Sequence, residues 1–125
     1  MWNMNIKVVA LLVALLAVSH CDQSVRAPSS SPSLISKGFI DDNSFRVVCR
    51  GFPEEGLTGV ERTESAKRAA LLSAYAFIQA EFIDKVAPDR DGKVEKFEVG
   101  NDAAIVYYVV SKRGLKKLRR PDQKP

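Results

Sequence analysis

Cys21 is the residue whose position in this sequence most clearly predicts chemistry. It lies just after an apolar run of eleven residues, Val8–Val18, which follows a short start with one positive charge, Lys7. Such a run is too short for a bilayer, which needs about 20 residues, but it matches the apolar core of a secretory signal peptide. A cysteine at the end of that core, followed by polar residues, is typical of a sulfur lipidated after cleavage. The sequence therefore predicts export and a lipid anchor at Cys21.

The same stretch allows a second way of processing. Ala17–Ser19 fits the small-x-small pattern of ordinary signal peptidase, and His20 stands where a lipidation signal normally has a small residue. Cleavage at that pattern would release a soluble periplasmic or secreted binding protein. In that protein Cys21 could pair with Cys49 in a disulfide. Both ways of processing remain open from the residues alone.

Catalysis is not expected. The sequence has a single histidine, His20, which cleavage before Cys21 would remove, so neither a Cys-His nor a Ser-His pair would remain. Cys49 alternates with Phe45 and Val47, as a buried strand residue does, and two cysteines match no zinc pattern. We therefore expect no enzyme activity, no catalytic residue, no cofactor and no small-molecule substrate.

One short motif overlays part of a calcium-binding loop. Asp89, Asp91 and Glu98 fall at positions 3, 5 and 12 of an EF-hand loop, with Gly92 at position 6. The first position is Ala87, so the leading carboxylate is missing. An Asp-x-Asp-Gly turn also forms between a helix and a strand for local reasons. The sequence predicts no metal site, and these three carboxylates are the weak calcium candidates.

Charge is unevenly distributed along the chain. Residues 21–111 hold eleven basic and fourteen acidic side chains, whereas residues 112–125 hold seven basic and one acidic. A basic cluster of this kind can bind anionic lipid headgroups or an acidic partner, or it can be a solvated C-terminus. Export argues against nucleic acid as a partner. The candidates for binding an anionic surface are Lys112, Arg113, Lys116, Lys117, Arg119 and Arg120.

Composition and hydropathy divide the chain into four parts. We expect a signal peptide over 1–20, the lipidated cysteine with a Ser/Pro-rich tether over 21–37, a small folded domain over 38–111 and a basic tail over 112–125.

The folded part is expected to be α+β. Alternation predicts strands at 45–50, 93–99 and 103–110, with 39–40 as a hairpin partner of the first across the turn at 41–44. Residues 51–62 are rich in glycine, which predicts a loop, and Gly100-Asn101 predicts a turn. Thr63 is a candidate N-cap for a helix running to about Val86, where Pro88 is expected to stop it. The prediction is one long alanine-rich helix packed on a three- to four-stranded, mainly antiparallel sheet.

Small residues at three- and four-residue steps predict the face of that helix that lies close to the sheet. They are Ala66, Ala69, Ala70, Ser73, Ala76 and Ala80.

The stretch FRVVCRGFP, the glycine-bearing loop and the helix TESAKRAALLSAYAFIQAEFI together resemble the Lpp-twenty-type family of bacterial lipoproteins. Gly51 stands at the family's glycine, and Lys67-Arg68 at its basic position. The helix signature falls on Ala66, Ala70, Ala74 and Tyr75. The resemblance implies a lipid-anchored envelope protein with a small α/β domain, and some relatives, of the FlgP type, are flagellum-associated outer-membrane lipoproteins. It implies no catalytic residues.

The expected function is therefore that of a lipoprotein held in the bacterial cell envelope by acyl chains, such as palmitate, on Cys21. The outer membrane is favoured, with the domain in the periplasm or at the cell surface. The domain is expected to act as a non-catalytic interaction or structural module, in a flagellar or cell-surface assembly. Its partner would be another envelope protein or a second copy of the chain. The soluble, disulfide-bonded binding protein is the alternative.

Overall fold

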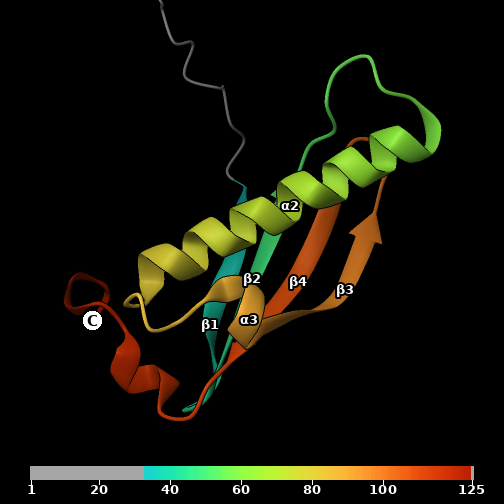
Figure 1. The fold of residues 1–125 in the computed structure, drawn as a ribbon. Helices are drawn as coiled ribbons and strands as arrows, with labels where there is room; N and C mark the ends of the chain where they lie inside the picture. The colour runs from blue at the N-terminus through green and yellow to red at the C-terminus, as the bar shows by residue number, and fades with distance from the viewer. Residues whose placement is uncertain (1–32, 125) are drawn as a thin grey trace, which may run out of the picture.

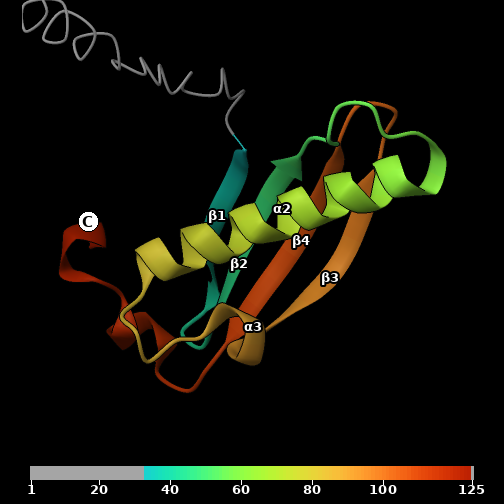
Figure 2. The same ribbon diagram turned by 45° about the horizontal axis from the view of Figure 1, so that its top comes forward.

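A computed structural model describes residues 33–124 and contains one long helix on one face of a sheet (Figures 1 and 2). The antiparallel strands lie in the order β1-β2-β4-β3. This arrangement confirms the α+β fold class. The strands are β1 (Leu34–Asp41), β2 (Ser44–Gly51), β3 (Gly92–Val99) and β4 (Ala104–Ser111), and the helices are α2 (Gly59–Glu81) and the short α3 (Pro88–Asp91).

The two hairpins follow local turn chemistry. Between β1 and β2, the Asp41 carboxylate accepts a hydrogen bond from the backbone N–H of Asn43 at 2.8 Å, which fixes the tight turn. Between β3 and β4, the backbone N–H of Gly100 donates to the carbonyl of Ala103 at 2.9 Å. Both turns lie where the sequence predicts them. β1 is longer than expected, however, since it starts at Leu34, within the segment assigned to the tether.

Helix α2 differs from its predicted limits at both ends. It begins at Gly59 after Thr58 rather than after Thr63, and it ends at Glu81 rather than near Val86. The early end has a tertiary cause, because Phe82 leaves the helix in an extended conformation and is almost fully buried, with its ring against Phe45. The proline expected to stop the helix, Pro88, instead occupies the first turn of α3, where its fixed φ suits a helix start.

The buried face of α2 follows a four-residue step along Ala66, Ala70, Ala74 and Ile78. Small side chains let the helix approach β2 so closely that a Cβ built on Gly51 would lie 2.1 Å from the backbone nitrogen of Ala70. The face is therefore set by these residues and by the glycine opposite them. The predicted stripe is correct in part, since Ala66 and Ala70 are buried but Ala76 and Ala80 are exposed.

The C-terminal segment belongs to the domain rather than trailing from it. Leu115, in the short 3₁₀ helix η1 (Leu115–Leu118), is fully buried in the core. The backbone of Ile83 donates to the carbonyl of Leu118 at 3.0 Å, and Phe82 forms an isolated β-bridge with Arg119. The segment, drawn in red at the end of α2, closes one end of the core (Figure 1). A second 3₁₀ turn, η2 (Pro121–Gln123), follows.

The sheet face opposite α2 has no covering element among residues 33–124. β4 is nevertheless apolar on both sides: it is central in the sheet, and its far side carries Tyr107 and the buried Val109. Irregular pairing at both ends of edge strand β1 and within edge strand β3 disfavours pairing of these edges with another chain. No helix within the described range is long and apolar enough to cross a bilayer.

Candidate functional site

The two cysteines differ in what the structure says of them. Cys21, the predicted lipidation site, lies outside the described residues, as do the signal peptide and most of the tether. Cys49 is fully buried between β2 and α2. Burial raises the pKa of its thiol from 9.0 to about 11, because the thiolate would have to leave water. Cys49 is therefore protonated and shielded at neutral pH, as its place in the alternating strand predicts.

A buried carboxylate organises the basic C-terminal segment. Glu81, the last residue of α2, is 1% exposed, and its two oxygens have different partners. Lys37 on β1 donates to one oxygen at 2.6 Å, and the guanidinium of Arg119 donates to the other. Two cations offset the cost of burying this charge. The same contacts tie strand β1 and the C-terminal segment to the end of α2.

Two more of the six candidate cations are also used within the fold. Lys112 donates to the carbonyl of Lys85 at 2.8 Å and lies 3.3 Å from the Asp91 carboxylate. Arg120 donates to the carbonyl of Gln79 at 3.2 Å and also pairs with the exposed Asp84 at 3.0 Å. With Arg119, they attach the C-terminal segment to its own domain. They are therefore not free for an external anion without weakening that attachment.

The remaining cations gather beyond this attachment. Lys116 lies 3.4 Å from Asp42, but both side chains are more than half exposed, so the pair is weak. Arg113 and Lys117 have no side-chain hydrogen bond or ion pair within the described range. Lys124, which sequence reasoning missed, joins them on the last described turn. A hollow of about 480 Å³ is lined by Asp42, Gly114, Lys116, Lys117 and Lys124.

The three calcium candidates do not come together. The Asp91 carboxylate accepts a hydrogen bond from the backbone N–H of Ala87 at 2.9 Å and faces Lys112, and these contacts lower its pKa. Glu98 pairs with Lys96 at 2.8 Å near the far end of β3, and this contact lowers the pKa of Glu98. Asp89 and Asp91 both lie in α3, and strand β3 therefore separates Glu98 from them by roughly 20 Å. No group of three His, Cys, Asp or Glu side chains within the described range is placed to hold a metal ion.

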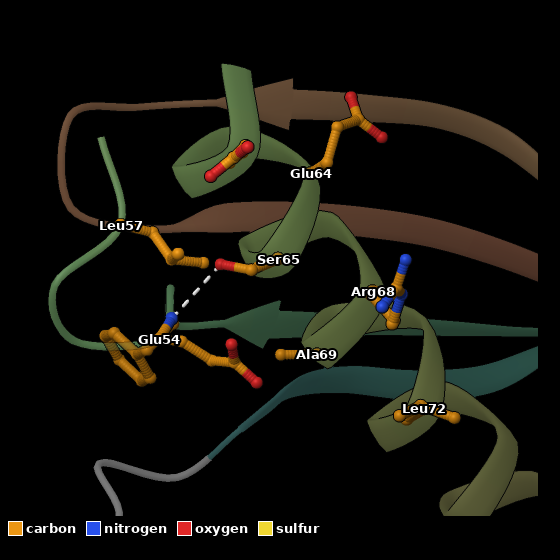
Figure 3. Close-up of a pocket in the computed structure, with 9 residues that line it drawn as sticks. Glu54, Leu57, Glu64, Ser65, Arg68, Ala69 and Leu72 are labelled. Carbon is orange, nitrogen blue, oxygen red and sulfur yellow. Dashed lines mark hydrogen bonds between the residues drawn. The ribbon is translucent and has the colours of Figure 1, made fainter. Parts of the chain in front are cut away.

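A second hollow lies at the opposite end of the domain, between the loop after β2 and the first turns of α2 (Figure 3). Its volume is about 390 Å³. The hydroxyl of Ser65 accepts a hydrogen bond from the backbone N–H of Glu54 at 3.1 Å and so fixes the loop against the helix. The lining combines apolar side chains with charged ones, and comprises Phe52, Glu54, Leu57, Glu61, Glu64, Ser65, Arg68, Ala69 and Leu72.

Phe52 and Leu72, on the rim of that hollow, are about half exposed. The arrangement offers apolar contact beside carboxylates, which suits binding rather than bond chemistry. The sequence predicted only a loop here, and Phe52, an aromatic residue directly after the strand, was the signal available. The hollow forms only because the loop folds back on α2.

No known protein family, curated protein or solved structure matches this chain.

Proposed function

We propose that this protein is an envelope lipoprotein, anchored through acyl chains on Cys21, whose α+β domain is a non-catalytic interaction module. The observation that carries the anchor is the burial of Cys49. A disulfide needs two cysteine Cα atoms within about 7 Å, and Cys49 lies sealed beneath α2. Pairing it with Cys21 would require the core to open. This leaves Cys21, at the end of the signal peptide, available for lipid.

The titratable groups of the domain favour an inert scaffold. Burial raises the pKa of Cys49 to about 11 and also raises the pKa of Tyr108, whose hydroxyl donates to the carbonyl of Pro88 at 2.6 Å. The Asp91 carboxylate is held ionised by a backbone hydrogen bond and a lysine. An acid or base poised near neutral pH would have a pKa shifted toward 7, and these shifts go the other way.

The proposed partner is another envelope protein or a second copy of the chain. The half-exposed side chains of Phe52 and Leu72 support this, since they flank a hollow between the loop after β2 and helix α2. The irregular edge strands disfavour strand addition, so we place the contact at this hollow rather than at a sheet edge. A flagellar or cell-surface assembly is the proposed setting.

The anchor is tested by the intact mass of the mature protein from its own host. We expect a chain that starts at Cys21 and carries glyceride and acyl groups. Thiol titration after denaturation should then count one free thiol, from Cys49. An unlipidated chain starting at His20, with no free thiol, would refute the anchor and identify the disulfide-bonded alternative.

The interaction is tested by photo-crosslinking in the host. A crosslinking amino acid at Leu72 should give a discrete adduct, with either a defined envelope protein or a second copy. The same amino acid at Lys93, exposed on the other side of the sheet, is the matched control. Equal adducts from both positions, or none from Leu72, would contradict a docking site at this hollow.

A further inference from the structure

We propose that the hollow beside the β1–β2 turn binds a linear polyanion with phosphate-type groups, through Lys116, Lys117 and Lys124. Its place in the envelope rests on the proposed lipid anchor, whereas the anion chemistry rests on the domain alone. This goes beyond a general anionic surface, since it selects the three cations that line one hollow.

Some cations of the C-terminal segment hold the fold, and others are available to a ligand. Arg119 and Arg120 are committed to Glu81 and Asp84 through contacts with the end of α2. Lys117 and Lys124 are exposed and have no side-chain partner within residues 33–124. Lys116 has two weak contacts, an exposed pair with Asp42 and a position 5.8 Å from the centre of the Phe39 ring. An incoming phosphate-type group therefore competes with little that stabilises the domain.

The residues that line the hollow favour phosphate-type groups as the ligand. Lysine ammonium groups are mobile point charges that suit phosphate-type groups. The lining offers no exposed aromatic or aliphatic side chain, since Leu115 points into the core. Stable protein contacts centre on buried apolar or aromatic anchors, which are missing here. Asp42 is the one carboxylate in the lining, so three lysines face a single negative charge. This chemistry favours a polymer of repeated anions over a folded acidic protein.

The position of the hollow favours a polymer as the ligand over the membrane that holds the anchor. The described chain enters the domain at the start of β1, where Leu34 pairs with Cys49, and the hollow lies past the far end of β1 at Asp42 (Figure 2). β1 spans about 23 Å and separates the hollow from the point where the described chain enters the domain. A hollow facing the same bilayer would need the domain inverted, with its chain entry turned away from that bilayer. We infer that it faces away from that membrane.

The test uses the mature lipidated chain in neutral phosphatidylcholine vesicles, with fluorescent inorganic polyphosphate as the probe. Polyphosphate should float with the vesicles, and its affinity should fall with rising salt. A cation near an anionic surface contributes about fivefold in affinity, so Lys117→Gln with Lys124→Gln should weaken binding about 25-fold. The control variant, Lys93→Gln with Lys96→Gln, removes the same charge at exposed positions on β3, away from both hollows, and should bind as the wild type does.

A second arm asks whether a lipid surface is the ligand instead. Amine-reactive labelling of Lys117 and Lys124, read by mass spectrometry, is compared on phosphatidylcholine and phosphatidylglycerol vesicles. We expect equal labelling on both and protection only by polyphosphate. Protection by the anionic vesicles would overturn the proposal in favour of the membrane. Equal weakening in the double variant and its control would reduce the effect to net charge and also overturn it.

The two proposals fail separately. If the mature protein carries no lipid, the anchor fails, but the unlipidated chain can still be titrated with polyphosphate in solution. Loss of polyphosphate binding in a chain whose lipid is confirmed by mass would overturn the polyanion site alone.

Discussion

Replacing Gly51 by alanine tests whether close approach of α2 to β2 is what holds the two layers together. The new Cβ would lie 2.1 Å from the backbone nitrogen of Ala70 and 2.3 Å from the carbonyl oxygen of Ala66, whereas ordinary contacts begin at 3.4 Å. Both atoms belong to helix backbone and cannot rotate away. The helix must therefore move outward by more than about 1 Å, which loosens every small side chain on its buried face.

The magnitude follows from two opposing terms. Overpacking of a rigid interface costs about 1–3 kcal/mol, and the loss of dispersion contacts along the helix places this case at the upper end. Alanine gains about 0.5–1 kcal/mol over glycine in a strand, since it loses less backbone entropy on folding. The clash dominates, so we expect Gly51→Ala to lose about 2 kcal/mol or more. For a domain of this size, a loss of about 2 kcal/mol lowers Tm by about 8–16 °C.

Gly38→Ala is the matched control, because Gly38 lies on neighbouring β1 and a Cβ there meets nothing within 4 Å. Both variants are measured by urea unfolding followed by circular dichroism, with the slope m compared to show that one transition is observed. We expect Gly38→Ala to match or exceed the wild type in stability. If Gly51→Ala were as stable as Gly38→Ala, the close helix–sheet packing would be refuted.

Three further perturbations test the C-terminal attachment and the buried thiol. Leu115→Ala should lower the free energy of unfolding by about 2–4 kcal/mol in urea titration, while Leu72→Ala at an exposed site stays within about 0.5 kcal/mol; equal effects would mean that the tail is not part of the core. Arg119→Gln leaves a buried carboxylate with one cation and should cost about 2–3 kcal/mol in thermal unfolding, whereas Lys117→Gln should cost almost nothing. Because the folded pKa of Cys49 is raised from 9.0 to about 11, the unfolded chain loses this proton first, and stability should fall as pH rises from about 9 to 11. Cys49→Ala should remove that part of the slope, and an unchanged slope would count against a sealed thiol.

Much of the sheet could be predicted from local pattern. The alternation around Phe45 and Cys49 predicts which side chains face the core, and the burial of both confirms it. The turn at 41–44 was readable because an aspartate bonds its own backbone two residues on. These features depend on neighbours along the chain, so a single sequence carries them.

The ends of α2 and the packing of the C-terminal segment could not be predicted from local pattern in this way. Thr63 looks like an N-cap, yet the helix starts at Gly59, since extended Thr58 precedes it and its carbonyl accepts a hydrogen bond from the backbone N–H of Arg62. The helix ends at Glu81 because Phe82 turns into the core. That end is set by a residue far away in the sequence, since the Phe82 ring packs against Phe45.

The basic segment shows the same contrast most clearly. Its composition determined a concentration of positive charge, and the apolar run before Cys21 determined an expectation of export; both follow from residue types alone. Only the tertiary structure decided which cations contact other parts of the fold. Arg119 pairs with Glu81, and Arg120 with Asp84, each across more than thirty residues of chain. Charge is a property of a residue, but whether that charge is free depends on what folding brings within about 4 Å of it.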